Sequence, residues 1–362
     1  MLNSEDAKTQ TTIEEIEVFT YPQAWTAADF ENVEAISVHL SPAHVAALEE
    51  RLAEVNARGP ALEDIGAEDF AHPDLDDVLG EVLRELMFGR GLVVLRGLPA
   101  DRYGADDMAK IYWGIGTHFG IALSQSALGD VLGHVQDLTK PGEEEDARGY
   151  TTARELRLHT DLAQIAGLFC YQPAEQGGVS VIANALAMHN QIAAEHPEFL
   201  PVYYKGFPYH RRGEQAPDAD EITPHAVPMF SNLNGNTSVF YVREILQNAA
   251  HAQGRTFSDL EVAALDYFDT CARDNAYRLR LEQGDAMFMN NRTTLHARTK
   301  FENGDGAGAK RHLMRLWLDV PGLRPDVPEI QVYENAGGRS GIDPQAGGQR
   351  ATADYRRMIA TG

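Results

Sequence analysis

Residues 284–296 read Gly-Asp-Ala-Met-Phe-Met-Asn-Asn-Arg-Thr-Thr-Leu-His, a turn that leads into a short apolar run and then into a second polar turn. Short strands that are separated by turn residues are typical of antiparallel barrels and jelly rolls, and less so of repeated strand–helix–strand units. Such apolar segments, bounded by Gly, Asn, Asp and Pro, recur through the second half of the chain at 165–171, 179–183, 238–242, 285–290 and 312–320. The second half therefore predicts a jelly-roll core.

The first half carries the signals of helices instead. Ser41 followed by Pro42 marks a helix start, because a hydroxyl caps the first amide groups and proline suits the first helical position. Apolar residues follow at helical spacing until Gly59, and a stronger apolar stripe covers 75–88 ahead of an expected buried strand at 92–95. Further helices are predicted at 106–118, 185–196 and 257–273. We therefore predict a β-rich α+β protein, in which helices flank a double-stranded β-helix, or jelly-roll, core.

The amino-acid composition indicates which kinds of binding partner the protein can have. The chain has 362 residues, 43% of them hydrophobic, and a formal net charge of −23. An acidic surface repels the phosphate backbone, so we expect no nucleic-acid partner, although a pocket can still be locally basic. The N-terminus lacks the apolar run of a signal peptide, and no window approaches the roughly eighteen uninterrupted apolar residues of a membrane span. With only two cysteines as well, the sequence predicts a cytoplasmic protein that does not span a membrane.

One histidine–carboxylate pair and a distant histidine have the composition of a metal site. His159 and Asp161 are two residues apart, so on a strand both side chains would leave the same face. With His296 they would supply two imidazoles and one carboxylate, the facial triad that suits iron(II) and leaves positions open for a bidentate oxoacid and O₂. Taken alone, an H-x-D pair is more often a hydrogen-bonded surface pair than a metal site. The hypothesis therefore depends on the residues downstream of His296.

The segment 311–318 supplies that support. It reads Arg-His-Leu-Met-Arg-Leu-Trp-Leu, and on a strand Arg311 and Arg315 would share one face while His312 points the other way. Arginine binds carboxylates bidentately, so two arginines in a barrel would suit a dicarboxylate cosubstrate and an acidic substrate. An internal ion pair of Arg315 with an acid such as Asp285 or Asp319 is the alternative.

Together these motifs resemble one enzyme family. From about Gly89 to Pro325 the chain is similar to the iron(II)/2-oxoglutarate dioxygenases of the taurine dioxygenase and 2,4-dichlorophenoxyacetate dioxygenase (TauD/TfdA-like) type. The stretches that carry the resemblance are Leu158-His159-Thr160-Asp161, Gly177-Gly178-Val179-Ser180, Asn290 to Arg298, and Arg311 to Leu318. The resemblance implies iron ligation by His159, Asp161 and His296. It also implies that Arg311 holds the far carboxylate of 2-oxoglutarate, that Ser180 assists where the family usually has threonine, and that Arg315 meets a substrate anion.

The resemblance also implies an activity. With Fe(II), 2-oxoglutarate and O₂, the enzyme would oxidise a C–H bond by hydroxylation, desaturation or cyclisation, and its substrate would be a small carboxylate-bearing or amino-acid-derived metabolite. Asp161 argues against halogenation, because related halogenases replace this carboxylate with a small residue. Gln125 and Arg148 precede the metal motif and are expected at the mouth of the substrate pocket, although Arg148 fits a surface loop equally well. The alternatives are a catalytically silent small-molecule-binding jelly roll and a redox-inactive metal enzyme.

The expected organisation has three parts. Residues 1–30 are polar and predict a flexible N-terminal arm, and residues 31–330 would form a single catalytic jelly-roll domain with a helical N-terminal part. Residues 331–362, which include a stretch rich in Gly, Gln and Ser, predict an irregular C-terminal tail. The sequence leaves a homo-oligomer open.

Overall fold

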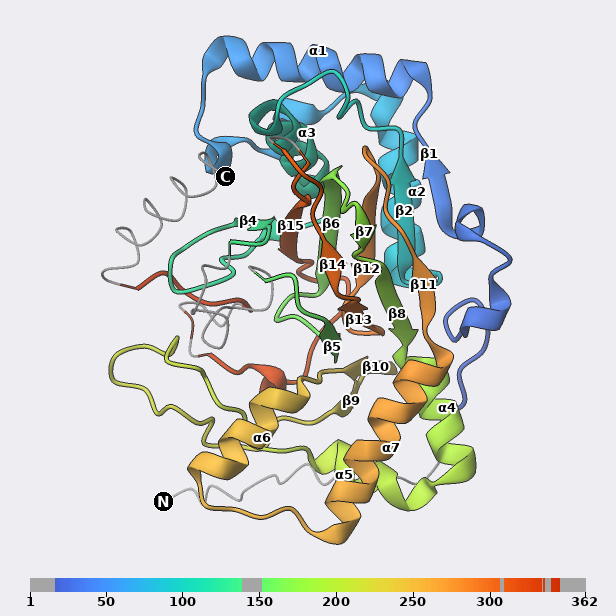
Figure 1. Cartoon of the computed structure of the whole chain (residues 1–362), viewed down its shortest axis with the longest axis vertical. Helices are drawn as coiled ribbons and strands as arrows, with labels where there is room; N and C mark the ends of the chain where they lie inside the picture. Colours follow the sequence, from blue (N-terminus) through green and yellow to red (C-terminus); the bar gives the residue numbers. More distant parts are fainter. Residues whose placement is uncertain (1–16, 139–151, 307–308, 334, 336–339, 346–362) are drawn as a thin grey trace, which may run out of the picture.

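The computed structural model of the chain describes residues 17–138, 152–306, 309–333, 335 and 340–345. Its largest element is a seven-stranded sheet in the order β1-β2-β12-β6-β15-β3, with β4 paired to β15 (Figure 1). Apart from the parallel pair β1 and β2, its strands run antiparallel. The strands are β1 (Ser37–His39), β2 (Leu92–Arg96), β3 (Ile121–Ala122), β4 (Leu132–Val135), β6 (Ile165–Gln172), β12 (Ala286–Asn290) and β15 (His312–Asp319).

A second, four-stranded sheet has the order β11-β8-β13-β5 and is antiparallel throughout. Its strands are β5 (Leu156–His159), β8 (Ser180–Asn184), β11 (Tyr277–Leu279) and β13 (Thr294–Arg298). One apolar cluster joins the two sheets, since it includes Leu92 and Met287 from the first and Ile182 and Leu279 from the second. Two largely antiparallel sheets that enclose a shared core make the predicted jelly roll, and the fold class is confirmed. Two short ribbons complete the strands: β7 (Gln176–Gly177) with β14 (Phe301–Glu302), and β9 (Phe230–Leu233) with β10 (Asn236–Val239).

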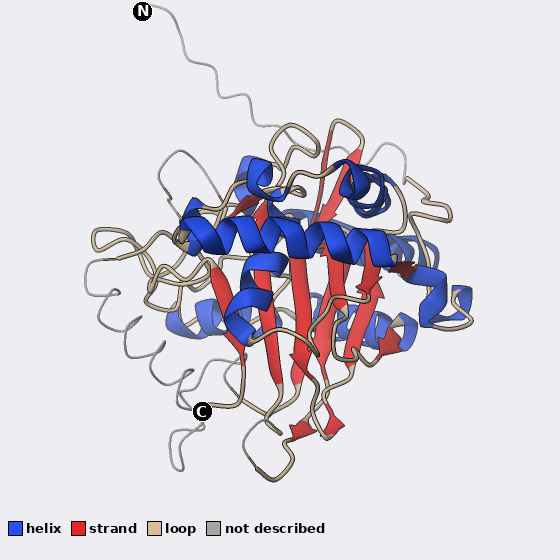
Figure 2. Ribbon diagram, turned by 90° about the horizontal axis from the view of Figure 1, so that it is seen from above, coloured by secondary structure: helices blue, strands red, loops and turns tan. Residues whose placement is uncertain are grey.

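Helices α1 (Pro42–Arg58), α2 (Pro73–Phe88) and α3 (Ala105–Thr117) cover the outer face of the large sheet (Figure 2). The first begins and ends where the sequence predicts: the Ser41 hydroxyl accepts a hydrogen bond from the His44 amide, and Gly59 caps the last turn at φ 64°. The apolar stripe of α2 packs with Phe288 and Met314 of the sheet in one buried cluster. These helices therefore bury the face of the sheet that points away from the barrel interior.

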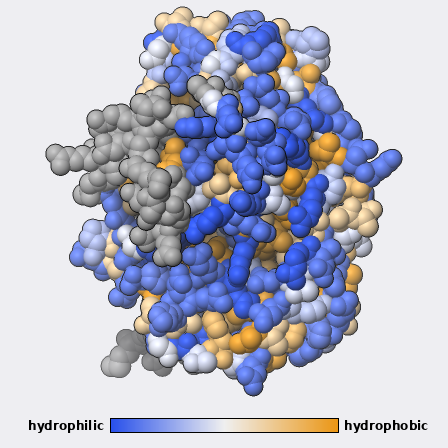
Figure 3. Space-filling view, in the orientation of Figure 1, coloured by the Kyte–Doolittle hydropathy of each residue, from blue (hydrophilic) through white to orange (hydrophobic). Residues whose placement is uncertain are grey.

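The remaining helices pack beside the second sheet, at the opposite end of the molecule from α1 (Figure 1). They are α4 (Ala185–Glu195), α5 (Leu200–Lys205), α6 (Arg243–Ala252) and α7 (Asp259–Asn275). Short 3₁₀ turns lie at Ala27–Asp29, Val33–Ile36, Leu62–Asp64, Ala67–Phe70, Pro197–Phe199 and Pro328–Ile330. Within the described residues, no helix is long and apolar enough to cross a membrane. The face shown in Figure 3 is mostly hydrophilic, with hydrophobic side chains scattered among polar ones.

The ends of the described chain are packed more closely than their composition suggests. Trp25 and Phe30 lie in the expected N-terminal arm, yet both are buried in the cluster between the sheets, and the Trp25 indole donates a hydrogen bond to the Arg90 carbonyl at 2.8 Å. In the expected C-terminal tail, Val332 and Tyr333 are buried although they lie in no helix or strand. Single aromatic side chains in polar segments thus find apolar partners that are distant in sequence. The three-part division of the chain stays a prediction.

Candidate active site

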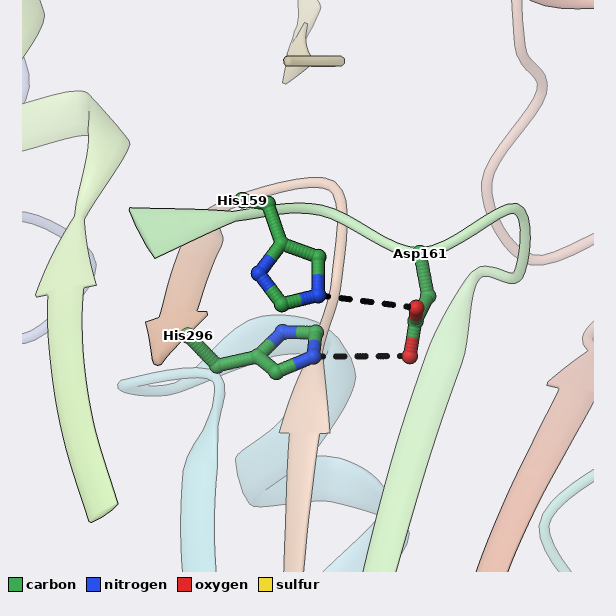
Figure 4. A group of neighbouring side chains, drawn as sticks. All are labelled: His159, Asp161 and His296. Carbon is green, nitrogen blue, oxygen red and sulfur yellow. Dashed lines mark ion pairs between the residues drawn. The ribbon is translucent and has the colours of Figure 1, made fainter. Parts of the chain in front are cut away.

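The three predicted metal ligands come together from two neighbouring strands. His159 is the last residue of β5, and His296, in the middle of β13, lies directly opposite it in the ladder. Asp161 follows in the loop after β5, so the strand that we expected through both residues ends two residues earlier than Asp161. The ligand atoms of all three side chains lie within 4.8 Å of one another (Figure 4). Two imidazoles and one carboxylate at this spacing fit a divalent transition metal such as iron(II).

The two imidazoles present the same nitrogen to the carboxylate. His159 Nε2 lies 3.9 Å from Asp161 Oδ1, and His296 Nε2 lies 3.4 Å from Asp161 Oδ2. His159 Nδ1 is 2.8 Å from the Arg157 carbonyl, which can only accept, so Nδ1 carries the proton and Nε2 keeps its lone pair for a metal. Burial and the neighbouring His296 lower the pKa of His159 to about 4. The imidazole is therefore neutral at physiological pH, as metal binding requires.

The carboxylate is held in place and kept ionised. Burial opposes the charge of Asp161, but Arg315 and then His296 outweigh it and leave the pKa of Asp161 well below its usual range. The Trp317 indole donates a hydrogen bond to Asp161 Oδ2 at 2.7 Å. Asn291 fixes the backbone of the same residue, because its side chain accepts from the Asp161 amide at 3.0 Å and donates to the Asp161 carbonyl at 2.7 Å. The Asn291 side chain therefore holds the loop that carries Asp161 against the turn after β12.

Arg311 lies just before β15 and points into a tight space beside the double glycine. A Cβ atom on Gly178 would be 3.1 Å from Arg311 Nε, and Gly178 has φ 64°, so a side chain there would be strained and crowded. Among the described residues, Arg311 Nη1 is buried without a hydrogen-bond partner. Burial and the charge of Arg298 lower the pKa of Arg311 to about 9. A buried cation with an unused donor has the properties of a carboxylate-binding group.

Ser180 begins β8 and is buried. It lies directly across the ladder from Arg298 of β13, so both side chains belong to the same face of the second sheet. Arg298 is the last residue of the motif Asn290 to Arg298, but the sequence alone predicts no role for it. The i, i+2 spacing from His296 was the available signal, since it predicts that both side chains leave one face.

A cavity of about 500 Å³ opens beside the triad. Its lining includes His159, Asp161, Arg315 and Trp317. The Arg315 guanidinium lies 3.7 Å from Asp161 Oδ1, whereas Asp285, one of the expected alternatives, pairs with Arg96 at 3.1 Å. The cavity therefore has a cationic side chain next to the predicted metal ligands.

Gln125 also lines this cavity, and its contact with a substrate stays a prediction. Arg315 Nε donates to the Gln125 side-chain oxygen at 2.8 Å, and the Gln125 amide donates to the Arg315 carbonyl at 2.9 Å. The second bond holds the Gln125 side chain on the backbone of β15, and the first then orients the Arg315 guanidinium. The other expected pocket residue, Arg148, lies outside the described residues. His312 faces away from the cavity and is 2.8 Å from His134 Nδ1, in agreement with its predicted orientation.

One part of the lining, here called the far wall, is aromatic and apolar and comes from segments that the sequence did not connect with the site, although charged residues of the same segments also line the cavity. Tyr209, Phe240, Tyr333 and Ile342 line it. Buried Arg211 joins two of these segments: its Nε donates to the Val332 carbonyl at 2.7 Å, and the Tyr333 hydroxyl donates to the Arg211 carbonyl at 2.9 Å. The segment after β15 is thus tied to the loop after α5 across the cavity. No local pattern signals this contact.

Comparison with known proteins agrees with this geometry. Residues 56–317 match the family described as taurine catabolism dioxygenase TauD, TfdA family. The chain belongs to this family. It is accordingly an Fe(II)/2-oxoglutarate-dependent dioxygenase with the His-Asp-His triad, and Fe(II) and 2-oxoglutarate are the family's cofactors.

Two curated relatives cover most of the dioxygenase. FR-33289 synthase of Streptomyces rubellomurinus is 28% identical over 302 residues, which are 82% of this chain and 88% of that protein. The taurine hydroxylase-like protein SAT17 of Stachybotrys chartarum is 27% identical over 332 residues, 85% of this chain and 83% of the relative. These relatives extend the similarity beyond the motifs to most of the fold.

Solved structures share the fold at lower identity. Asparagine oxygenase in complex with Fe(II), 2S,3S-3-hydroxyasparagine and succinate has a TM-score of 0.62 at 16% identity, with 78% of this chain and 94% of that chain covered. The non-heme iron oxygenase OrfP in complex with Fe and alpha-ketoglutaric acid has a TM-score of 0.57 at 15% identity, with the same coverage of 78% and 94%.

Proposed function

We propose that His159, Asp161 and His296 bind Fe(II), and that Arg311, assisted by Ser180, binds the far carboxylate of 2-oxoglutarate. The enzyme then oxidises a C–H bond of a small carboxylate-bearing or amino-acid-derived metabolite. The observation that carries the proposal is the convergence of the three ligand atoms within 4.8 Å beside a cavity that contains Arg315. The chemistry that bound iron and 2-oxoglutarate supply is the activation of O₂, with conversion of 2-oxoglutarate to succinate and CO₂.

The residues around the site prepare it for that chemistry. Arg315 keeps Asp161 ionised and Trp317 donates to it, so the carboxylate holds its charge and orientation inside the barrel. The Arg157 carbonyl keeps the proton of His159 on Nδ1. These contacts fix the protonation state and direction of the ligands before a metal binds, which lowers the cost of assembling the site.

We infer that Arg315 and Gln125 contact the substrate. The Arg315 guanidinium is 3.7 Å from a ligand oxygen, so an anionic group bound there would place its neighbouring carbon atoms close to the metal. The aromatic and apolar far wall suits an uncharged part of the same molecule. Arg148 remains a prediction for this pocket. Asparagine oxygenase holds 3-hydroxyasparagine, and OrfP holds (3S)-hydroxy-L-Arg, which supports an amino-acid-derived substrate.

The metal site is tested by loading the anaerobic apo-protein with Fe(II) and titrating 2-oxoglutarate, while the weak visible metal-to-ligand charge-transfer band is followed. We expect the band in the native protein, its loss in His159→Ala, and a higher 2-oxoglutarate concentration for half-saturation in Arg311→Ala. No band in the native protein, with iron demonstrably unbound, would leave a silent binding protein or a different metal enzyme.

The substrate class is tested separately. Succinate formation would be measured with L-amino acids and their derivatives, and the products would be identified by mass: a gain of one oxygen for hydroxylation, a loss of two hydrogens for desaturation or cyclisation. Stimulation by carboxylate-bearing compounds that is lost in Arg315→Met would support the proposal. Stimulation only by compounds without an anionic group would contradict it. The cytoplasmic location and a homo-oligomeric state stay predictions.

A further inference from the structure

Two buried arginines meet inside the barrel around one aromatic ring. The guanidinium carbons of Arg298 and Arg311 lie 4.7 and 4.9 Å from the centroid of the Phe301 ring. Both side chains are buried, with 6% and 4% of their residue surface exposed. Within the described part of the chain, neither forms a salt bridge, although the charge of Asp137 acts on Arg298 and partly opposes the effect of burial on its pKa. Two like charges in one apolar space are unfavourable unless an anion joins them.

In the part of the chain that the structure describes, several guanidinium nitrogen atoms of these two arginines lack a hydrogen-bond acceptor, which also indicates a site for an anion. Arg298 Nη2 donates to the Thr152 carbonyl at 2.9 Å and to the Arg154 carbonyl. Its Nε and Nη1 atoms, and Nη1 of Arg311, are buried without a partner among the described residues. A single carboxylate offers two oxygens and about four acceptor positions, enough for these three nitrogen atoms. Leaving such donors unused in a protein interior costs free energy.

The place of Arg298 on its strand relates it to the proposed iron site. Arg298 lies two residues beyond His296. In the ladder between β13 and β8, His296 lies opposite Ile182 and Arg298 lies opposite Ser180, so both side chains leave the same face of β13. Two residues of a strand span about 6.5 Å, a distance that a five-carbon dicarboxylate bound at the metal can bridge. Ser180, which we assign to the far carboxylate, is the cross-strand neighbour of Arg298.

We propose that Arg298 is a second cation for the far carboxylate of 2-oxoglutarate, next to Arg311. The inference rests on the proposed function, since it assumes that 2-oxoglutarate binds between the triad and Arg311. Arg298 would then favour 2-oxo acids with a second carboxylate over those without one. This selectivity separates a binding role from a purely structural one, because a general loss of packing would weaken both kinds of oxo acid.

The test compares two 2-oxo acids in the anaerobic Fe(II) protein, with the charge-transfer band as readout. 2-Oxoglutarate has the far carboxylate, and 2-oxobutyrate has the same chelating end without it. In Arg298→Met we expect the Kd of 2-oxoglutarate to rise about 10- to 100-fold, the effect of lost hydrogen bonds to a charged group. The Kd of 2-oxobutyrate should change by less than about threefold, because it makes no contact with Arg298.

Arg324→Met is a matched control. Arg324 is also buried, has an unpartnered Nε among the described residues, and donates from Nη2 to the Thr237 carbonyl, but it lines a different cavity. Its substitution should leave both Kd values unchanged. If Arg298→Met fails to fold, Arg298→Lys keeps the charge without the planar fork and should show a smaller loss confined to 2-oxoglutarate.

The outcomes separate the two proposals. An unchanged Kd for 2-oxoglutarate in the Arg298 variants, or an equal loss for both oxo acids, overturns the role of Arg298 while the native band upholds the proposed function. A native protein that binds Fe(II) but gives no band with 2-oxoglutarate overturns both.

Discussion

Replacing Trp317 by phenylalanine removes one hydrogen bond from the proposed metal site and leaves most of its packing. The indole nitrogen donates to Asp161 Oδ2 at 2.7 Å, and the ring lies under the Arg315 guanidinium, 4.6 Å from its central carbon to the ring centroid. Phenylalanine keeps an aromatic ring for that stacking but has no donor. A hydrogen bond to a charged group contributes about 1.5–3 kcal/mol, and loss of a partner of a metal ligand commonly weakens metal binding by about 10- to 100-fold. We therefore expect Fe(II) affinity to fall by about that factor.

The assay is anaerobic Fe(II) binding in competition with a chromogenic chelator, together with thermal unfolding of the apo-protein. Trp113→Phe is the control, because the Trp113 indole is equally buried and donates to the Ile65 carbonyl at 2.9 Å in the helical layer. Both variants should lose stability, and only Trp317→Phe should lose Fe(II) affinity. Native Fe(II) affinity in Trp317→Phe, or an equal loss in Trp113→Phe, would refute the argument that this hydrogen bond supports the ligand.

Three further changes test other parts of the structure. Gly178→Ala places a Cβ 3.1 Å from Arg311 Nε, and about 1–2 kcal/mol of crowding and strain should weaken 2-oxoglutarate binding about tenfold. Gly213→Ala is the control, because Gly213 has φ 75° but no atom lies within 4 Å of the added Cβ, so 2-oxoglutarate binding should not change. Equal Kd values for the two variants in the charge-transfer titration would contradict this prediction. Tyr333→Ala removes part of the far wall of the cavity, so KM for the substrate should rise while kcat changes less. An unchanged KM in steady-state assays would show that the far wall does not contact the substrate. Burial lowers the pKa of His189 from 6.5 to about 4. Between these pH values the unfolded chain binds a proton that the folded chain does not, so the free energy of unfolding falls as pH decreases. In denaturant titrations, His189→Gln should show a shallower fall of the free energy of unfolding with pH, and the same pH dependence as the native protein would count against the burial effect.

Helices α1, α2, α3, α4 and α7 and the longer strands follow from local signals, whereas α5, α6 and several short strands were not predicted. Ser41, Pro42 and Gly59 predict the bounds of α1 because caps act through hydrogen bonds within one turn. The apolar runs at 165–171 and 312–320 correspond to β6 and β15. The strand that we expected to run through both His159 and Asp161 differs from the observed strand β5. It ends at His159, because the next residues turn to bond other segments: the Thr160 amide donates to the Tyr241 carbonyl at 2.9 Å.

The sequence by itself determined the chemistry available to this dioxygenase: which side chains are able to bind a metal, and which arginines alternate on one strand. Only the tertiary structure decided how these groups meet. The pairing of β13 with β5 sets His296 opposite His159, and the packing of β15 brings Trp317 to Asp161. The same holds for the meeting of Arg298 and Arg311 at the Phe301 ring and for the far wall of the cavity. The physical reason is that caps and periodicity act over a few residues, whereas strand register and side-chain contacts between distant segments depend on the burial of the whole core.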